Sequence, residues 1–111
     1  GNTAVLKPSE LSPASSRVMA DMIKETFSPD YIALVQGGVE ASERLLAERW
    51  DHIFFTGSTT VGRIIAKAGA EHLSRVTLEL GGKDAMIVCS DADIDRAVNG
   101  ALISFRNRLG R

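Results

Sequence analysis

The sequence contains little cysteine or histidine, and its positive and negative charges nearly balance. The 111 residues contain one cysteine, Cys89, which excludes a framework of internal disulfide bonds and favours a reducing compartment. The two histidines, His52 and His72, lie far apart with no second ligand nearby, so we expect no metal site. The formal net charge of −1 gives no electrostatic reason to expect nucleic acid as a partner.

Long apolar runs and targeting signals are also missing. The longest apolar run, residues 31–35, has the length of a buried strand and is too short to span a membrane. No basic segment leads into an apolar stretch, so no signal peptide is visible and we expect a cytoplasmic location. The chain begins at Gly1, without a methionine, and ends at Arg111 in what reads as the middle of an element. We therefore expect a fragment that is truncated at both ends.

The sequence does contain a regular alternation of strand and helix patterns. With 44% hydrophobic and 24% charged residues, residues 1–111 have the composition of one globular domain. Short apolar runs predict strands over residues 3–6, 31–35, 52–56, 75–80 and 85–89. Helical spacing predicts helices over residues 13–27, 40–49, 58–70 and from the cap Asp93 onward. This order predicts an α/β fold, in which helices flank a parallel sheet.

Apolar side chains recur every three or four residues on the predicted helices, so we expect each stripe to face the core. The stripe on the first helix comprises Val18, Met19, Met22, Ile23 and Phe27. The stripe on the third comprises Val61, Ile64, Ile65 and Ala68, and that on the last Ile94, Ala97, Val98, Ala101, Leu102 and Phe105. We also expect Cys89 to be buried in the predicted strand 85–89 as a small hydrophobic residue.

Ligands of open parallel sheets bind beyond the carboxyl ends of the strands. We therefore expect the ligand-binding loops to be residues 7–10, 36–38, 56–62 and 79–83, all opening onto one edge. In the third loop Gly57 permits a tight turn, and a helix that begins at Ser58 or Thr59 directs free N–H groups at a bound phosphate. A capped turn without a ligand is as consistent with this local pattern.

Two standard phosphate-binding motifs fail in this loop. A Walker motif needs lysine and a hydroxyl residue after Gly62, where the chain has Arg63 and Ile64. A dinucleotide fingerprint needs a third glycine, at the position of Thr59. Local spacing therefore predicts a phosphate site without saying of which kind.

Two further sets of charged residues follow predicted strands. Glu79 lies at the end of an apolar strand, where partial desolvation would suit a general base. An exposed glutamate paired with Lys83 explains the same pattern equally well. Lys7 and Glu10 follow the first strand and have the chemistry to hydrogen-bond a ribose, although the residues alone favour a solvated helix entrance.

Three motifs in order resemble the aldehyde dehydrogenase superfamily. They are Lys7-Pro8-Ser9-Glu10, then Phe55-Thr56-Gly57-Ser58 with Val61-Gly62, then Leu78-Glu79-Leu80-Gly81-Gly82-Lys83. The resemblance runs from residue 1 to about residue 102 and is strongly specific, because all three motifs keep the family's spacing. The turn at residues 35–40 and the segment 50–55 look most like the class 3 and fatty-aldehyde branch.

The resemblance implies a partial, Rossmann-like NAD(P)-binding domain over residues 1–111. Lys7 and Glu10 would hold the adenosine ribose, and Glu79 would activate the water that completes the reaction. Leu80 would lie beside the nicotinamide. The pyrophosphate would lie on Gly57, Ser58, Thr59, Thr60, Val61 and Gly62. A glutamate at position 10 favours NAD, because it would repel a 2′-phosphate, but NADP is possible in class 3-like members.

The resemblance also implies an enzyme that oxidises an aldehyde to a carboxylic acid and whose full-length form is a homo-oligomer. The family's nucleophilic cysteine should lie about thirty residues beyond Glu79, and Cys89 lies on the wrong strand to replace it. Residues 105–111 only half resemble the approach to that cysteine. We therefore expect the isolated chain to lack the nucleophile and to be inactive. The alternative is a non-catalytic nucleotide-binding module, either truncated or a pseudoenzyme.

Overall fold

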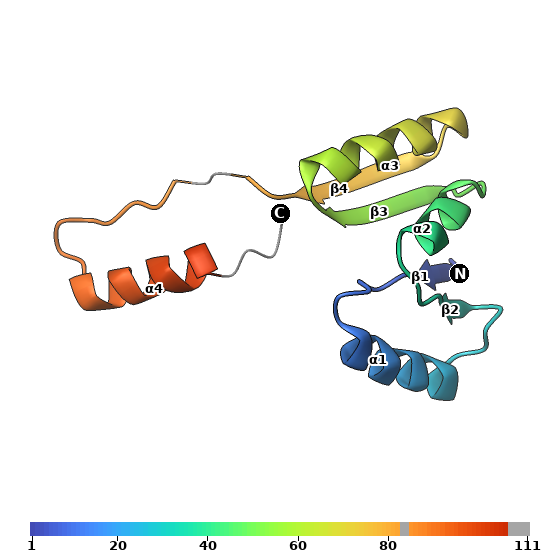
Figure 1. Cartoon of the computed structure of the whole chain (residues 1–111), viewed down its shortest axis with the longest axis horizontal. Helices are drawn as coiled ribbons and strands as arrows, with labels where there is room; N and C mark the ends of the chain where they lie inside the picture. Colours follow the sequence, from blue (N-terminus) through green and yellow to red (C-terminus); the bar gives the residue numbers. More distant parts are fainter. Residues whose placement is uncertain (83–84, 107–111) are drawn as a thin grey trace. The chain divides into compact units, whose positions relative to one another are not determined.

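The computed structural model describes residues 1–82 and 85–106 (Figure 1). Lys83, the alternative partner of Glu79, and the tail at residues 107–111 lie outside this described part. The chain divides into two compact units, residues 1–48 and residues 49–111. That both units belong to one coenzyme-binding domain stays a prediction.

The first unit is a βαβ unit followed by a short helix. Strand β1 (Ala4–Leu6) leads through helix α1 (Pro13–Thr26) to strand β2 (Ile32–Leu34), and helix α2 (Val39–Leu46) follows. The two strands are parallel, with Leu6 paired to Leu34 at their carboxyl ends, and α1 packs against β2. Because the strands run in the same direction, the loops that follow them leave from the same edge.

Helix α1 begins where the sequence predicts, with Ser12 as N-cap and Pro13 in the first turn. Proline is favoured there because its missing N–H would have no helical acceptor in any case. The Ser12 side chain makes no capping hydrogen bond. The helix ends before Ser28-Pro29, because a proline disfavours the helical conformation of the residue before it.

The second unit contains a longer βαβ unit. Strand β3 (His52–Gly57) leads through helix α3 (Thr59–Glu71) to strand β4 (Arg75–Leu80), and helix α4 (Ile94–Arg106) follows a long connection. Strands β3 and β4 are parallel and pair along their whole length, from His52 with Arg75 to Gly57 with Leu80. Helix α3 packs against both strands and lies along them in Figure 1.

Successive side chains along β3 and β4 point alternately to the side of the sheet that faces α3 and to the opposite side. Ile53, Val76 and Leu80 approach glycines of α3 and therefore lie on the helix side. The opposite side carries His52, Phe54, Thr56, Thr77 and Glu79, and there the His52 Nε2 and Thr77 Oγ1 atoms are 2.9 Å apart and hydrogen-bonded. This opposite side contacts no described helix.

The prediction that the apolar helix stripes face a core is largely wrong. On α3 the buried residues are Gly62, Ile65 and Gly69, whereas Val61 and Ile64 of the predicted stripe are 41% and 56% exposed. Glycines bring the helix backbone close to the sheet, so the larger side chains beside them are displaced to the flanks. Four members of the α1 stripe, Val18, Met19, Met22 and Phe27, and three of the α4 stripe, Ile94, Val98 and Leu102, are also exposed. Of the described elements α1 contacts only β2, and α4 contacts none, so nothing described covers their apolar sides.

The predicted strand at residues 85–89 is absent, and the prediction that Cys89 is buried is wrong. The described residues form two separate two-stranded sheets, and residues 85–89 pair with neither. A strand requires the amides and carbonyls of a neighbour, and without one Met86, Ile87, Val88 and Cys89 are exposed. By contrast, the predicted cap of the last helix is confirmed, because the Arg96 N–H donates to Asp93 Oδ1 at 3.1 Å.

Candidate functional site

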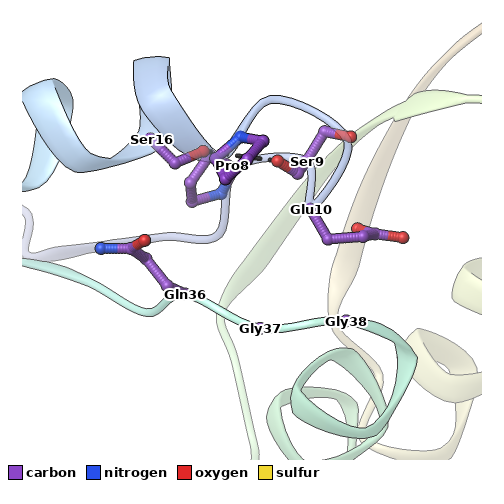
Figure 2. Close-up of a pocket in the computed structure, with 8 residues that line it drawn as sticks. Pro8, Ser9, Glu10, Ser16, Gln36, Gly37 and Gly38 are labelled. Carbon is purple, nitrogen blue, oxygen red and sulfur yellow. Dashed lines mark hydrogen bonds between the residues drawn. The ribbon is translucent and has the colours of Figure 1, made fainter.

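A shallow pocket lies at the carboxyl ends of β1 and β2, where the sequence predicts one. Its volume is about 200 Å³, and Figure 2 shows the loop after β1 on one wall and the loop after β2 on the other. The pocket is lined by Pro8, Ser9, Glu10, Pro13, Ser16, Gln36, Gly37 and Gly38. The structure therefore brings the predicted loops 7–10 and 36–38 together.

Lys7 and Glu10 form an ion pair beside this pocket. The Lys7 Nζ atom lies 3.1 Å from Glu10 Oε2 and also donates to the Pro8 carbonyl at 3.2 Å. A hydrogen bond from the backbone of Glu10 itself, followed by the hydrogen bond and charge of Lys7, lowers the pKa of the Glu10 carboxyl. Glu10 is therefore held as an anion, and its side chain is about half exposed to solvent.

Ser16 fixes the loop that carries Glu10, and sequence reasoning missed it. Its hydroxyl donates to the Ser12 carbonyl at 2.9 Å and lies 3.3 Å from the Ser9 carbonyl, which also accepts from the Ser12 N–H. Ser16 is 4% exposed. The available signal was the spacing of two serines four residues apart, since a serine in a helix commonly donates to the carbonyl four residues earlier.

The wall formed by Gln36, Gly37 and Gly38 depends on glycine. Gly37 has a φ of +151°, and a Cβ placed on it would lie 2.6 Å from the Cβ of Ala41. The turn therefore brings the backbone against the first turn of α2, as close as only glycine allows. A more open hollow of about 470 Å³ continues along α2, where Arg44 pairs with Glu40 at 2.7 Å.

The second candidate site is the N-terminus of α3. Ser58 is the N-cap, and its hydroxyl accepts from the Val61 N–H at 3.2 Å, while its carbonyl accepts from the Gly62 N–H at 2.8 Å. The sequence predicted this cap, with Thr59 as the alternative. The N–H groups of Thr59 and Thr60 have no acceptor among residues 1–82 and 85–106. They point along the helix axis with the positive end of the helix dipole, which is the arrangement that binds anions.

The loop after β4 lies against this helix start. A Cβ on Gly62 would be 2.7 Å from Leu80 Cδ2, so the absence of a side chain at Gly62 is what lets Leu80 pack there. The Gly81 N–H donates to the Gly57 carbonyl at 3.3 Å and extends the β3–β4 pairing by one residue. The structure therefore brings the predicted residues of 57–62 together with Leu80.

Glu79 lies on the other side of the sheet from Leu80. It pairs in register with Thr56, the last residue of β3 before Gly57, and its side chain is exposed. The sequence predicted partial burial, but the flanking Leu78 and Leu80 point to the α3 side and leave the carboxylate in water. Each unit thus holds its own set of predicted residues at the carboxyl ends of its strands.

Parallel βαβ units with polar loops and a capped helix start at the strand ends define an α/β protein of the Rossmann-like kind, as the sequence predicts. The sequence model of the aldehyde dehydrogenase family matches residues 1–110, and the chain belongs to that family. None of the described helices is long and apolar enough to cross a membrane. No three described His, Cys, Asp or Glu side chains form a group able to hold a metal ion.

Similar proteins support the assignment to this family and to its class 3 branch. The chain is 44% identical over 103 residues to aldehyde dehydrogenase family 3 member H1 of Arabidopsis thaliana, covering 93% of this chain and 21% of the relative. It is 45% identical over 97 residues to the dimeric NADP-preferring aldehyde dehydrogenase of Canis lupus familiaris, covering 87% and 21%. The NAD+ complex of an aldehyde dehydrogenase from Bacillus cereus superposes with a TM-score of 0.76 at 40% identity, covering 89% and 21%. The chain thus spans about one fifth of the length of these relatives.

Proposed function

We propose that this chain forms the coenzyme-binding part of an NAD(P)-dependent dehydrogenase that oxidises aldehydes to carboxylic acids. The observation that carries this proposal is the pocket at the ends of β1 and β2, which is lined by Glu10 beside its ion-pair partner Lys7. The family supports the reaction class, and the bound NAD+ in the Bacillus cereus structure supports the coenzyme. When bound, the nicotinamide coenzyme supplies the hydride acceptor.

At the first site, Glu10 would accept hydrogen bonds from the ribose hydroxyls. An anionic carboxylate is the stronger acceptor, and the Glu10 carboxyl, whose pKa lies below its ordinary value of 4.5, is ionised at neutral pH. The same charge would repel a 2′-phosphate, so we propose NAD as the preferred coenzyme. Because a relative is named NADP-preferring, and because Lys7 lies next to Glu10, NADP is the coenzyme to compare.

At the second site, the N–H groups of Thr59 and Thr60 would donate to the pyrophosphate. These two donors lack an acceptor among the residues that the structure describes, and the hydroxyls of Ser58 and Thr60 lie on the same turn. The same turn also includes Val61 and two glycines without side chains, Gly57 and Gly62. The sequence predicted a phosphate site without saying of which kind. We propose that the phosphate bound there belongs to a dinucleotide.

Beyond the helix start, Leu80 would present an apolar surface to the nicotinamide, and Glu79 would accept the proton of the water that attacks the acyl group. Glu79 is exposed, so water reaches its carboxylate freely. Cys89 follows Glu79 by only ten residues and lies outside any helix or strand. We propose that it is not the nucleophile and that the 111 residues alone bind coenzyme without oxidising aldehydes.

The binding proposal can be tested by isothermal titration of the 111-residue chain with NAD+, NADP+ and magnesium ATP. We expect NAD+ to bind most tightly. Preference for magnesium ATP would contradict the proposal and favour a phosphotransferase. Aldehyde-dependent NADH formation by the chain would contradict its proposed inactivity.

A sharper test replaces Thr59, the first residue of α3, by proline. Proline removes one free N–H but is well tolerated at this helix position, and Ser58 already has the extended backbone that precedes a proline, with ψ of 151°. Loss of one hydrogen bond to a charged group should weaken NAD+ binding by roughly 10-fold or more. Thr59→Ala, which keeps the N–H, is the matched control. Equal binding by the proline and alanine variants would exclude the helix start as the phosphate site.

Two further properties stay predictions. A homo-oligomeric state of the protein in its full-length form would be tested by its mass in solution. A cytoplasmic location would be tested by imaging the tagged protein in its own cells.

A further inference from the structure

The first pocket and the hollow along α2 share one wall. The residues that line both spaces are Gln36, Gly37 and Gly38. Because the two glycines have no side chains, the carboxamide of Gln36 is the one side chain, among the described residues, that borders both spaces (Figure 2). Gln36 is exposed and forms no hydrogen bond with the part of the chain that the structure describes. Its carboxamide is therefore available to a ligand that extends from the pocket into the hollow.

A nucleotide whose ribose lies beside Glu10 would place its base in the hollow along α2. This step rests on the proposed function. The base is joined directly to the ribose, so it occupies space that adjoins the first pocket. The hollow adjoins that pocket, and its volume of about 470 Å³ lies in the usual range of small-molecule sites, about 300–1,000 Å³. Its lining includes the half-buried apolar residues Val35, Ala41 and Leu45, which suit the faces of a flat aromatic ring.

A primary amide is complementary to one edge of adenine. Adenine presents its N6 amino group, which is a donor, beside the ring nitrogen N7, which is an acceptor. The Gln36 carboxamide has the matching pair, a carbonyl oxygen that accepts and an NH2 group that donates. Glutamine binds adenine in this bidentate way in protein–DNA complexes. Guanine and hypoxanthine carry an oxygen at position 6, so the same edge presents two acceptors, and only one of the two hydrogen bonds can form.

The other polar side chains that line the hollow are charged, and none of them combines a donor with an acceptor. Arg44 has the donors that would bind the two acceptors of guanine, but its guanidinium is paired with Glu40 at 2.7 Å. Glu48 can accept from the N6 amino group of adenine, but an ionised carboxylate has no hydrogen to donate to N7. Within the hollow, Gln36 alone matches the edge of adenine.

We propose that Gln36 selects adenine as the base of the coenzyme. Its carbonyl oxygen accepts from the N6 amino group, and its NH2 group donates to N7. Gln36 is thus a specificity-determining residue for the base and has no part in the chemistry of the reaction. A bidentate contact of this kind discriminates between bases by roughly 5-fold to 150-fold. We expect the lower part of this range, because Gln36 is exposed to water that competes for its hydrogen bonds.

The test compares NAD+ with nicotinamide hypoxanthine dinucleotide by isothermal titration of the complete 111-residue chain. The unaltered chain should bind NAD+ more tightly, by at least about 5-fold. Gln36→Met, which keeps an unbranched side chain of similar length without the carboxamide, should bind the two dinucleotides equally. Glu48→Met makes the corresponding change elsewhere in the hollow, and this matched control should keep the preference. Both dinucleotides are compared on the same variant, so a change in the folded fraction cancels from the ratio of affinities.

Three results would overturn the proposal: equal affinities in the unaltered chain, an unchanged preference in Gln36→Met, or loss of the preference in Glu48→Met alone. The last result would identify Glu48 as the residue that selects the base. Failure of the unaltered chain to bind NAD+ at all would overturn the proposed function, and this proposal with it. Binding of NAD+ without a preference over the hypoxanthine dinucleotide would overturn this proposal alone, so the two failures are distinguishable.

Discussion

The Cγ2 methyl group of Val76 occupies the space beside Gly69 that the Cβ of any other residue at position 69 would fill. This contact joins the last turn of α3 to β4. Val76 cannot easily move away, because a β-branched side chain has one strongly preferred χ1 rotamer and the strand is paired with β3. Gly69 is also fixed by its carbonyl, which accepts from the Ser74 N–H at 2.9 Å.

Gly69→Ala should therefore destabilise the second unit. Overpacking costs about 1–3 kcal/mol, which exceeds the roughly 1 kcal/mol that alanine gains over glycine in a helix. Gly100→Ala in α4 is the matched control, because a Cβ there would meet nothing within 4 Å and should be neutral or stabilising. Chemical denaturation followed by circular dichroism measures both variants, and equal effects would show that the Val76 contact is unimportant.

Removal of the α3 cap should weaken both folding and phosphate binding. Ser58→Ala deletes the acceptor of the Val61 N–H, and loss of such a cap typically costs about 1 kcal/mol. Ser58→Asp restores the acceptor and should recover stability. The aspartate would also place a negative charge where the pyrophosphate is proposed to lie. Thermal melts and NAD+ titrations of both variants should therefore separate the two roles, with recovered stability and weaker binding for Ser58→Asp.

Gly37→Ala should close the first pocket or distort its wall, whereas Gly38→Ala should not. The new methyl group at position 37 would collide with Ala41 and would require a φ of +151°, which L-residues rarely adopt. Gly38 has a φ of −87° and open space around its Cα. We expect lower stability and weaker NAD+ binding for Gly37→Ala alone. Similar losses in both variants would point to the flexibility of the loop and not to the contact with Ala41.

The Glu10 carboxyl should titrate below its ordinary pKa of 4.5. Since the folded state holds the pKa below the unfolded value, the contribution to stability is present above the unfolded value and is lost as the pH falls through the folded one. Lys7→Gln should raise the pKa, but only part of the way, because the backbone hydrogen bond of Glu10 is the larger cause and remains. Carbon-detected NMR titration measures the midpoint. Lys24→Gln removes an equal charge elsewhere and should leave the midpoint unchanged.

Sequence reasoning placed the elements well where the pattern was local. Strand β4 matches the predicted residues 75–80, and α1 and α3 begin at the predicted serine caps. Parallel pairing then brought the loops 7–10 and 36–38 together in one unit, and 57–62 with Leu80 in the other. Caps, turns and strand direction are properties of a few neighbouring residues, so they can be read before the fold is known.

Burial could not be read in the same way. A periodic stripe shows which side of a helix is apolar, but whether Val18 or Ile94 is buried depends on what lies opposite. The buried side of α3 was missed because glycines contribute nothing to an apolar stripe, although Gly62 and Gly69 make the closest contacts with the sheet. The predicted strand 85–89 likewise required a partner strand that no local pattern specifies.

Ile65, which is 6% exposed, is the one large apolar side chain that is buried in the part of the chain that the structure describes. A folded state that withdraws so little apolar surface from water has a small intrinsic free energy of folding. Its melting temperature is then governed by mass action: whatever binds the folded form, and not the unfolded chain, adds RT ln(1 + [L]/Kd) to its stability. For these 111 residues, the coenzyme concentration would thus set the fraction of chains that are folded as well as the fraction that carry coenzyme.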